Sequence, residues 1–334
     1  GYLQRLGRSP RRGIFEPLEP RCVLATFTVN DPADSVSPDP TLTSLREAIE
    51  LANSLAGPDF IEFAPSIEGQ TLDVVAGQLE ILDDLTVRGL GADRLTLDAQ
   101  EQNRLLRIAP GVTTQLEGIT VRRGLAQDDN GGAILNQGTL TLDQVVVRDS
   151  VLLLTEQSPS ELGGGGIYND AGAQLTMIGS HVVETISRDD GGGILNRGSL
   201  TLRDGSSVSG NRANYSGGGI HSPAGDVTLI DSVIENNQTI PYGGGLAFEG
   251  EELRISDSRL HGNVGQIGGA LWIGSEAGDV VIDSSQLSGN TGSVYGGAVF
   301  TRAVTSIQRS TVFDNTAFFW GGGLLVSNDG TLTL

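Results

Sequence analysis

Residues 191–194 read Gly-Gly-Gly-Ile, residues 200–202 read Leu-Thr-Leu and residues 208–211 read Val-Ser-Gly-Asn, before Gly-Gly-Gly-Ile returns at 217–220. This order of elements occurs five times up to residue 315, with 25–28 residues between consecutive Gly-Gly-[Gly/Ala] triplets. Each copy closes on an asparagine with an aliphatic residue three positions before it, at Asn211, Asn237, Asn263, Asn290 and Asn315. A fixed period of this length predicts a solenoid, because one repeat cannot bury its own apolar face and must stack on its neighbour.

Within each copy, apolar residues alternate with a period of two, as in the pairs Leu200/Leu202, Val227/Leu229 and Leu253/Ile255. Both members of a pair therefore face one side of a short strand, and turn residues end each run. No 3.6-residue periodicity occurs within a copy, which excludes helical repeats, and no helix follows the asparagine as a leucine-rich repeat would require. Hexapeptide periodicity, typical of a left-handed β-helix, is absent. We predict an all-β fold, a right-handed parallel β-helix with three short strands and three turns per coil.

The recurring residue types have structural roles in such a coil. Leu, Ile and Val fill the interior, and the Gly-Gly pairs lie at turns, where glycine reaches positive φ without a steric penalty. Asparagines at one register are expected to stack, each side-chain amide bonding the next one about 4.8 Å away. Asparagine also tolerates the left-handed conformation of a tight corner.

Composition limits the classes of partner. The 334-residue chain has a formal net charge of −20, and all 21 basic residues are arginine, so we expect no nucleic-acid partner. The single cysteine, Cys22, excludes an internal disulfide framework, and the absence of an 18-residue apolar run predicts no transmembrane segment. An acidic surface would attract Ca²⁺. The Gly-Gly-x-Gly-x-Asp nonapeptides of calcium-binding β-rolls are missing, however, and we predict no metal site and no cofactor.

The first 26 residues differ from the rest, since they contain five arginines and three prolines. They are either a disordered tail or an export-associated segment. Phe15-Glu16-Pro17-Leu18-Glu19-Pro20-Arg21-Cys22-Val23-Leu24-Ala25 resembles the LEPR-XLL segment of large exported bacterial surface proteins, departing from it at residues 22–24. The resemblance implies export, and a targeting segment of this kind is not part of the predicted fold.

A single helix is predicted within residues 41–53. Ser44 and Glu47 have the spacing of a capping box, and an apolar face is formed by Leu45, Ala48, Ile49 and Ala52. We expect this helix to lie across the open end of the solenoid, where a bare terminal coil would expose apolar residues. The sequence at 44–49 resembles the CSLREA motif found ahead of β-helical domains in bacterial surface proteins, with Thr43 replacing its leading cysteine.

The chain divides into three parts. Residues 1–26 form the basic segment, residues 27–130 the helix and about three degenerate coils, and residues 131–334 the regular coils. Because the last residues, Thr331-Leu332-Thr333-Leu334, correspond to the middle of a coil, we expect a longer protein with a C-terminal remainder.

The regular coils resemble the repeats of polymorphic outer membrane proteins. Gly131-Gly132-Ala133-Ile134 matches their Gly-Gly-Ala-Ile element, and Val312-Phe313-Asp314-Asn315 approaches their Phe-x-x-Asn element with phenylalanine one place late. Those proteins are surface adhesins and autotransporter passengers. The resemblance implies an extracellular or outer-membrane-associated location. We expect adhesion or a structural-spacer role, with a surface polysaccharide or another surface protein as partner.

The alternative is a polysaccharide lyase or glycoside hydrolase, since both occur on this fold. Hydrolysis needs carboxylates about 5–9.5 Å apart, and the candidates that precede Gly-Gly turns are Asp128, Asp129, Asp189 and Asp190. Aspartate is also common at turns because it bonds its own backbone. The Gly-His-Gly and Arg-Ile-Lys elements of a pectinase-like hydrolase are missing, whereas a Ca²⁺-dependent lyase with an arginine base stays open.

A set of aromatic residues suggests a carbohydrate-binding surface instead of an active site. Tyr242, Tyr295 and Trp320 each stand three residues before the end of their glycine triplet, and Tyr215 stands four before. They should line one edge of the rod with about 5 Å between coils, where ring faces could stack on successive sugar rings. The alternative is an aromatic ladder that stabilises the turns by about 0.5–1.5 kcal/mol per pair.

Overall fold

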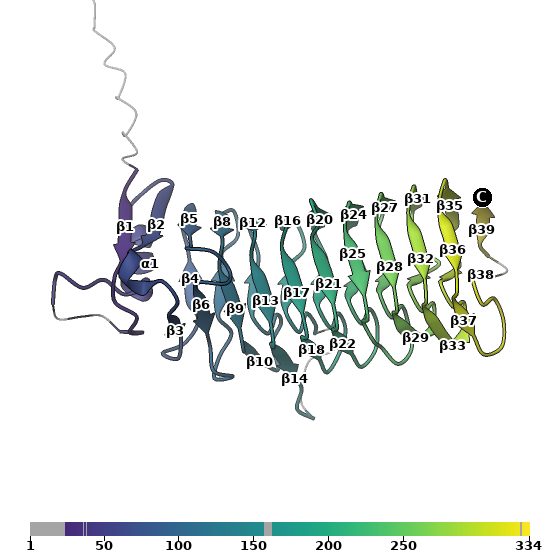
Figure 1. The fold of residues 1–334 in the computed structure, drawn as a ribbon, viewed down its shortest axis with the longest axis horizontal. Helices are drawn as coiled ribbons and strands as arrows, with labels where there is room; N and C mark the ends of the chain where they lie inside the picture. Colours follow the sequence, from purple (N-terminus) through teal and green to yellow (C-terminus); the bar gives the residue numbers. More distant parts are fainter. Residues whose placement is uncertain (1–23, 36, 38, 157–161, 328) are drawn as a thin grey trace, which may run out of the picture.

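The computed structural model describes residues 24–35, 37, 39–156, 162–327 and 329–334. The LEPR-XLL-like segment, including Cys22, therefore lies almost wholly outside the described residues. The described chain forms one elongated right-handed parallel β-helix, with successive coils side by side from the N-terminal to the C-terminal end (Figure 1). The predicted fold class is confirmed.

Three long parallel sheets run along the rod, and every strand pairs with the equivalent strand of the next coil. Sheet A has twelve strands: β1 (Thr26–Val29), β2 (Asp59–Phe63), β5 (Leu85–Arg88), β8 (Thr113–Glu117), β12 (Thr139–Asp143), β16 (Gln174–Ile178), β20 (Ser199–Arg203), β24 (Asp226–Ile230), β27 (Glu252–Ser256), β31 (Asp279–Asp283), β35 (Val304–Gln308) and β39 (Thr331–Thr333). Sheet B has ten: β3 (Thr71–Asp73), β6 (Thr96–Asp98), β9 (Thr120–Arg122), β13 (Val146–Arg148), β17 (His181–Val183), β21 (Ser207–Ser209), β25 (Val233–Glu235), β28 (Arg259–His261), β32 (Gln286–Ser288) and β36 (Thr311–Phe313). Sheet C also has ten: β4 (Leu79–Ile81), β7 (Leu106–Ile108), β11 (Ile134–Asn136), β15 (Ile167–Asn169), β19 (Ile194–Asn196), β23 (Ile220–Ser222), β26 (Leu246–Phe248), β30 (Leu271–Ile273), β34 (Val299–Thr301) and β38 (Leu324–Val326).

A fourth, short strand follows sheet B in many coils, which corrects the prediction of three strands per coil. These strands form two small groups that we call sheet D: β10 (Leu125–Gln127), β14 (Val151–Leu153), β18 (Ile186–Ser187) and β22 (Arg212–Ala213), then β29 (Val264–Ile267), β33 (Thr291–Tyr295) and β37 (Thr316–Ala317). A complete coil therefore runs through sheets A, B, D and C. Most of these strands have only two or three residues and so carry too little alternation to be detected from the sequence.

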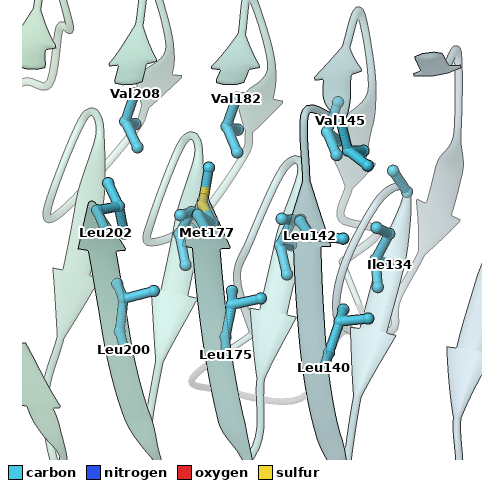
Figure 2. Close-up of a cluster of buried hydrophobic side chains, with 14 of the residues drawn as sticks. Ile134, Leu140, Leu142, Val145, Leu175, Met177, Val182, Leu200, Leu202 and Val208 are labelled. Atoms are coloured by element: carbon cyan, nitrogen blue, oxygen red, sulfur yellow. The ribbon is translucent and has the colours of Figure 1, made fainter. Parts of the chain in front are cut away.

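Equivalent core residues lie in single file. Leu202 pairs with Leu229, which pairs with Ile255, and each is no more than 1% exposed. Figure 2 shows the same stacking in earlier coils, where Leu140, Leu175 and Leu200 point into the interior alongside the row of Leu142, Met177 and Leu202. Burying each such side chain contributes about 1.5–3 kcal/mol, so the stacked interior accounts for the stability of the rod.

The predicted asparagine ladder is present at the corner between sheets B and D. The Nδ2 of Asn211 donates to the Oδ1 of Asn237 at 3.0 Å, and the same contact continues through Asn263, Asn290 and Asn315. The expected left-handed backbone does not fall on these asparagines, however. It falls on the residue before each one, at Gly210, Asn236, Gly262, Gly289 and Asp314, so that the asparagine side chain can point inward.

A second ladder escaped the sequence analysis. At the ends of sheet C strands, Asn136 donates to Asn169 and Asn169 donates to Asn196, both at 2.7 Å. Asn196 in turn donates to the Oγ of Ser222 at 3.0 Å.

Helix α1 (Leu45–Ser54) confirms the predicted helix. Ser44 and Glu47 form a reciprocal capping box, and the apolar face joins the main core. The helix packs against β1, β2 and β4, at the N-terminal end of the rod (Figure 1). One short 3-10 helix, Pro65–Ile67, follows β2.

The glycine triplets combine two different requirements. The first glycine has positive φ, as predicted, for example 62° at Gly243. The second has no room for a side chain, because a Cβ on Gly244 would lie 2.4 Å from the carbonyl carbon of Val264 in the next coil. Close approach of neighbouring coils therefore explains the second glycine better than backbone conformation does.

Candidate functional site

The chain at the junction of sheets D and C, including the last residues of β29 and β33, carries a row of residues that pair from coil to coil, and we call it the edge row. Parallel bridges and strand pairing align its members, which are Gly163, Asp190, Ser216, Tyr242, Ile267, Tyr295 and Trp320. The predicted register of Tyr242, Tyr295 and Trp320 along one edge is thus confirmed.

The aromatic members of the edge row contact other rings. Tyr295 and Trp320 are stacked, with ring centroids 5.3 Å apart and planes 8° from parallel. Tyr242 lies against Trp272 of the next coil, with centroids 4.8 Å apart and an interplanar angle of 34°. Trp272 comes from the outer face of sheet C, where its strand neighbour is Phe300. We refer to Tyr242, Trp272, Tyr295, Phe300 and Trp320 together as the aromatic edge.

Two rings of the aromatic edge are exposed to solvent, and the other three are half-buried. Tyr242 is 38% exposed and Trp320 is 64% exposed. A shallow hollow of about 300 Å³ is lined by Tyr295, Phe300, Trp320, Leu325, Val326 and Ser327. Apolar rings at the wall of an open hollow are the kind of surface on which the apolar face of a ligand can lie.

Tyr215 lies one residue out of register with the edge row, whereas two rings that were not predicted, Trp272 and Phe300, lie beside it. Tyr215 is 57% exposed and makes no ring contact among the described residues, because Ser216 occupies its place in the edge row. Trp272 and Phe300 were missed, although each stands two positions after a Gly-Gly-Ala triplet. That position is the outward residue of the sheet C strand, and this regularity could have identified them.

Each carboxylate of the first acidic pair, Asp128 and Asp129, is engaged in contacts that stabilise turns. The backbone N–H and the hydroxyl of Thr155 donate to Asp128 at 2.7 and 2.9 Å. Asp129 accepts from the Nη2 of Arg104 at 2.6 Å. Arg104 is 7% exposed and also donates to the carbonyl oxygens of Asn130 and Gly131, so its guanidinium is held within the turn.

The second acidic pair is more buried. Asp189 accepts from the N–H of Leu162 at 3.2 Å, and burial together with the neighbouring Asp190 raises the pKa of Asp189. Burial acts in the same direction on Asp190, but His221 and the N–H of Ser216, which donates at 2.7 Å, outweigh it and lower the pKa of Asp190. The Nδ1 of His221 lies 3.4 Å from Asp190, close enough for an ion pair but not aligned for a hydrogen bond.

The two acidic pairs come from coils that are not neighbours, because the coil containing Gly163 lies between them. Their contacts are those of turn aspartates, and a catalytic role for the four residues stays a prediction. Within the described ranges, no group of three or more His, Cys, Asp or Glu side chains could hold a metal ion. In the same part of the chain, α1 falls short of the length and apolar character that crossing a bilayer requires.

Comparison of the chain with protein-family models and with curated proteins gave no match.

Proposed function

We propose that this protein is an exported cell-surface β-helix that acts in adhesion by binding carbohydrate along its aromatic edge. The observation that carries the proposal is the set of rings on successive coils, with half-buried Trp272 against exposed Tyr242 and half-buried Tyr295 against exposed Trp320. The cell-surface part of the proposal is supported by the sequence resemblances, in particular the LEPR-XLL-like and CSLREA-like segments.

The ring geometry favours a ligand with apolar faces. Parallel rings whose centroids are 5.3 Å apart are offset, so each leaves part of its face uncovered. Sugar rings present C–H groups on one face and hydroxyls around their rim, and an open aromatic surface suits the first while water satisfies the second. If a sugar covers about 80 Å² of ring surface, the gain is about 2 kcal/mol, or roughly thirty-fold in affinity.

A binding assay against immobilised neutral polysaccharides tests the proposal. The wild-type chain should be retained, and a Trp272→Ala/Tyr295→Ala double variant should lose roughly ten-fold or more in affinity, because the apolar contact area is removed. Tyr215→Ala is the matched control, since Tyr215 is an exposed tyrosine of the neighbouring turn with no ring partner among the described residues. Equal binding by the double variant and the wild type, with reduced thermal stability, would mean that the rings form a stabilising ladder only.

The same incubations distinguish binding from catalysis. Soluble products are expected to be absent after incubation with each polysaccharide. Release of reducing ends or of unsaturated sugars would instead identify a hydrolase or a lyase and overturn the proposed adhesive role.

A further inference from the structure

A second concave surface lies on the outer face of sheet B, away from the edge row. It is a groove of about 680 Å³ that crosses the coils of β6, β9, β13 and β17. Its floor is formed by outward residues that pair in register, in the order Thr96, Thr120, Val146 and His181. Three steps of about 4.8 Å make this floor roughly 15 Å long.

The wall of the groove is an insertion in one early coil. Seven residues, 89–95, connect β5 to β6, whereas two residues, 144–145, connect β12 to β13. The hydroxyl of Thr120 donates to the carbonyl oxygen of Ala92 at 2.7 Å and so ties the insertion to the floor. Residues 91–94 of this loop line the groove.

Three arginines line the groove, Arg94, Arg122 and Arg148, with Asp93 as the one acidic lining residue. Arg122 and Arg148 occupy equivalent positions on neighbouring strands. This concentration is unusual for a chain with a net charge of −20, and residues 88–148 contain seven arginines and seven acidic residues. This stretch of the β-helix therefore has no net formal charge.

Carboxylates outside the lining hold these arginines in place. The Nε of Arg122 donates to Asp98 at 2.7 Å, and Asp98 is fully buried and also accepts from Arg123. Arg148 pairs with Asp149 at 2.7 Å and with Glu184 at 3.1 Å. Two arginines share Asp98, and the terminal nitrogens of Arg122 make no protein hydrogen bond among the described residues.

The later coils do not continue this arrangement. At the positions equivalent to Arg122 and Arg148, they carry Val183, Ser209, Glu235, His261 and Ser288. The loop, the floor and the arginines thus come together at one place along the rod.

We propose that this groove binds a short acidic oligosaccharide, extended along the rod, with its carboxylates on Arg122 and Arg148. Guanidinium groups match carboxylates in charge and planar geometry, and Thr96, Thr120 and Gln144 supply partners for sugar hydroxyls. The site is distinct from the aromatic edge and selects charged rather than neutral sugars.

Other polyanions fit the groove less well. The net charge of −20 opposes a densely charged polymer such as nucleic acid. A peptide is disfavoured because the strands of the floor are paired on both sides and offer no free edge for strand addition. Of the lining side chains, Ala92 and Val146 are the apolar ones, so an apolar peptide anchor has no pocket.

Titration calorimetry of the whole chain with oligomers of a hexuronic acid tests the site. The wild type should bind with an affinity that falls as salt is raised, and Arg148→Gln should weaken binding by about ten-fold or more because one charge-assisted contact is lost. Arg254→Gln is the matched control, because Arg254 is an exposed arginine on sheet A that also pairs with two carboxylates, Glu252 and Asp279. It removes the same charge and should leave binding unchanged.

Several results would overturn the inference. They are no uronate binding by the wild type, equal weakening by Arg254→Gln, and tighter binding of a polyglutamate peptide than of the uronate oligomer. Loss of uronate binding in the Trp272→Ala/Tyr295→Ala variant would also overturn it, because it would place the ligand on the aromatic edge. Circular dichroism of each variant separates a lost contact from a lost fold.

Discussion

The asparagine ladder and the edge row are two corners of the same coils. Residues stack at the same coil spacing at both corners, but their side chains point in opposite directions. At the ladder corner the side chains point inward, and Asn237, Asn263 and Asn290 are fully buried. At the edge row the side chains point outward, and the row changes from Gly163 through Asp190 and Ser216 to aromatic residues. A buried polar group must find a partner on its neighbour, so the ladder corner keeps polar side chains, with Ser150 and Thr185 at the equivalent register of earlier coils. The edge row has no such constraint and is free to carry function.

The backbone of the edge row is nevertheless as tightly packed as the ladder. The glycines that follow it donate N–H groups to the next coil, as Gly244 does to Gly268 at 3.1 Å. The backbone is therefore tightly packed at both corners, whereas the side chains point inward at the ladder corner and outward at the edge row.

Breaking the ladder should have the largest effect. Asn263→Ala removes the acceptor for the N–H and the Nδ2 of Asn237 and leaves both donors buried. We expect the free energy of unfolding to fall by about 3–5 kcal/mol, since each unsatisfied buried group costs about 1–3 kcal/mol. Urea denaturation measures this change. Asn214→Ala, which removes one exposed hydrogen bond to Arg188, is the control and should cost about 0.5 kcal/mol or less.

A substitution in the glycines that follow the edge row should have the second-largest effect on the free energy of unfolding. Gly244→Ala places a Cβ 2.4 Å from a backbone carbon of the next coil and should lower the free energy of unfolding by about 2–3 kcal/mol. Gly205→Ala is the comparison, because Gly205 has φ of 78° but open space around it. It should cost about 1 kcal/mol, and a larger loss at Gly205 than at Gly244 would mean that coil-to-coil packing is not the tighter constraint.

Removing an edge-row ring should affect stability less. Tyr295→Ala loses its contacts with Trp320 and Phe319, which contribute about 0.5–1.5 kcal/mol. A thermal melt measures this difference. A loss as large as that of Asn263→Ala would show that the two corners do not differ in the way described.

The smallest expected effect is the pH dependence of stability that arises from Asp189 and Asp190. The pKa of Asp190 is lowered in the folded protein, so Asp190 stabilises the fold above its usual pKa of 3.8, and this contribution is lost as the pH falls through the folded value. The pKa of Asp189 is raised, so stability falls as the pH rises from 3.8 through the folded value.

At pH 7, Asp190→Asn should therefore be less stable than the wild type and Asp189→Asn more stable. Both differences should shrink in thermal melts toward pH 3. The same sign of change for both variants at pH 7 would contradict the assignment of the two pKa shifts.

Much of the architecture could be predicted because its causes are local or strictly periodic. The capping box at Ser44 and Glu47 lies within four residues, and the alternation of Leu200 with Leu202 lies within three. The asparagines repeat at the coil period, so their stacking followed from the fold. The short strands of sheet D, the second asparagine ladder and the left-handed residue before each asparagine did not follow, because each depends on how the chain bends at a corner.

The sequence by itself determined that this chain coils into a parallel β-helix with a capped N-terminal end, because a buried interior imposes one periodic pattern on every coil. Only the tertiary structure decided which outward side chains meet. Tyr242 with Trp272, Asp190 with His221, and Arg122 with Arg148 are each separated by 26–31 residues. Outward positions carry no periodic requirement, so their pairing depends on the register of neighbouring coils and on the insertions between strands.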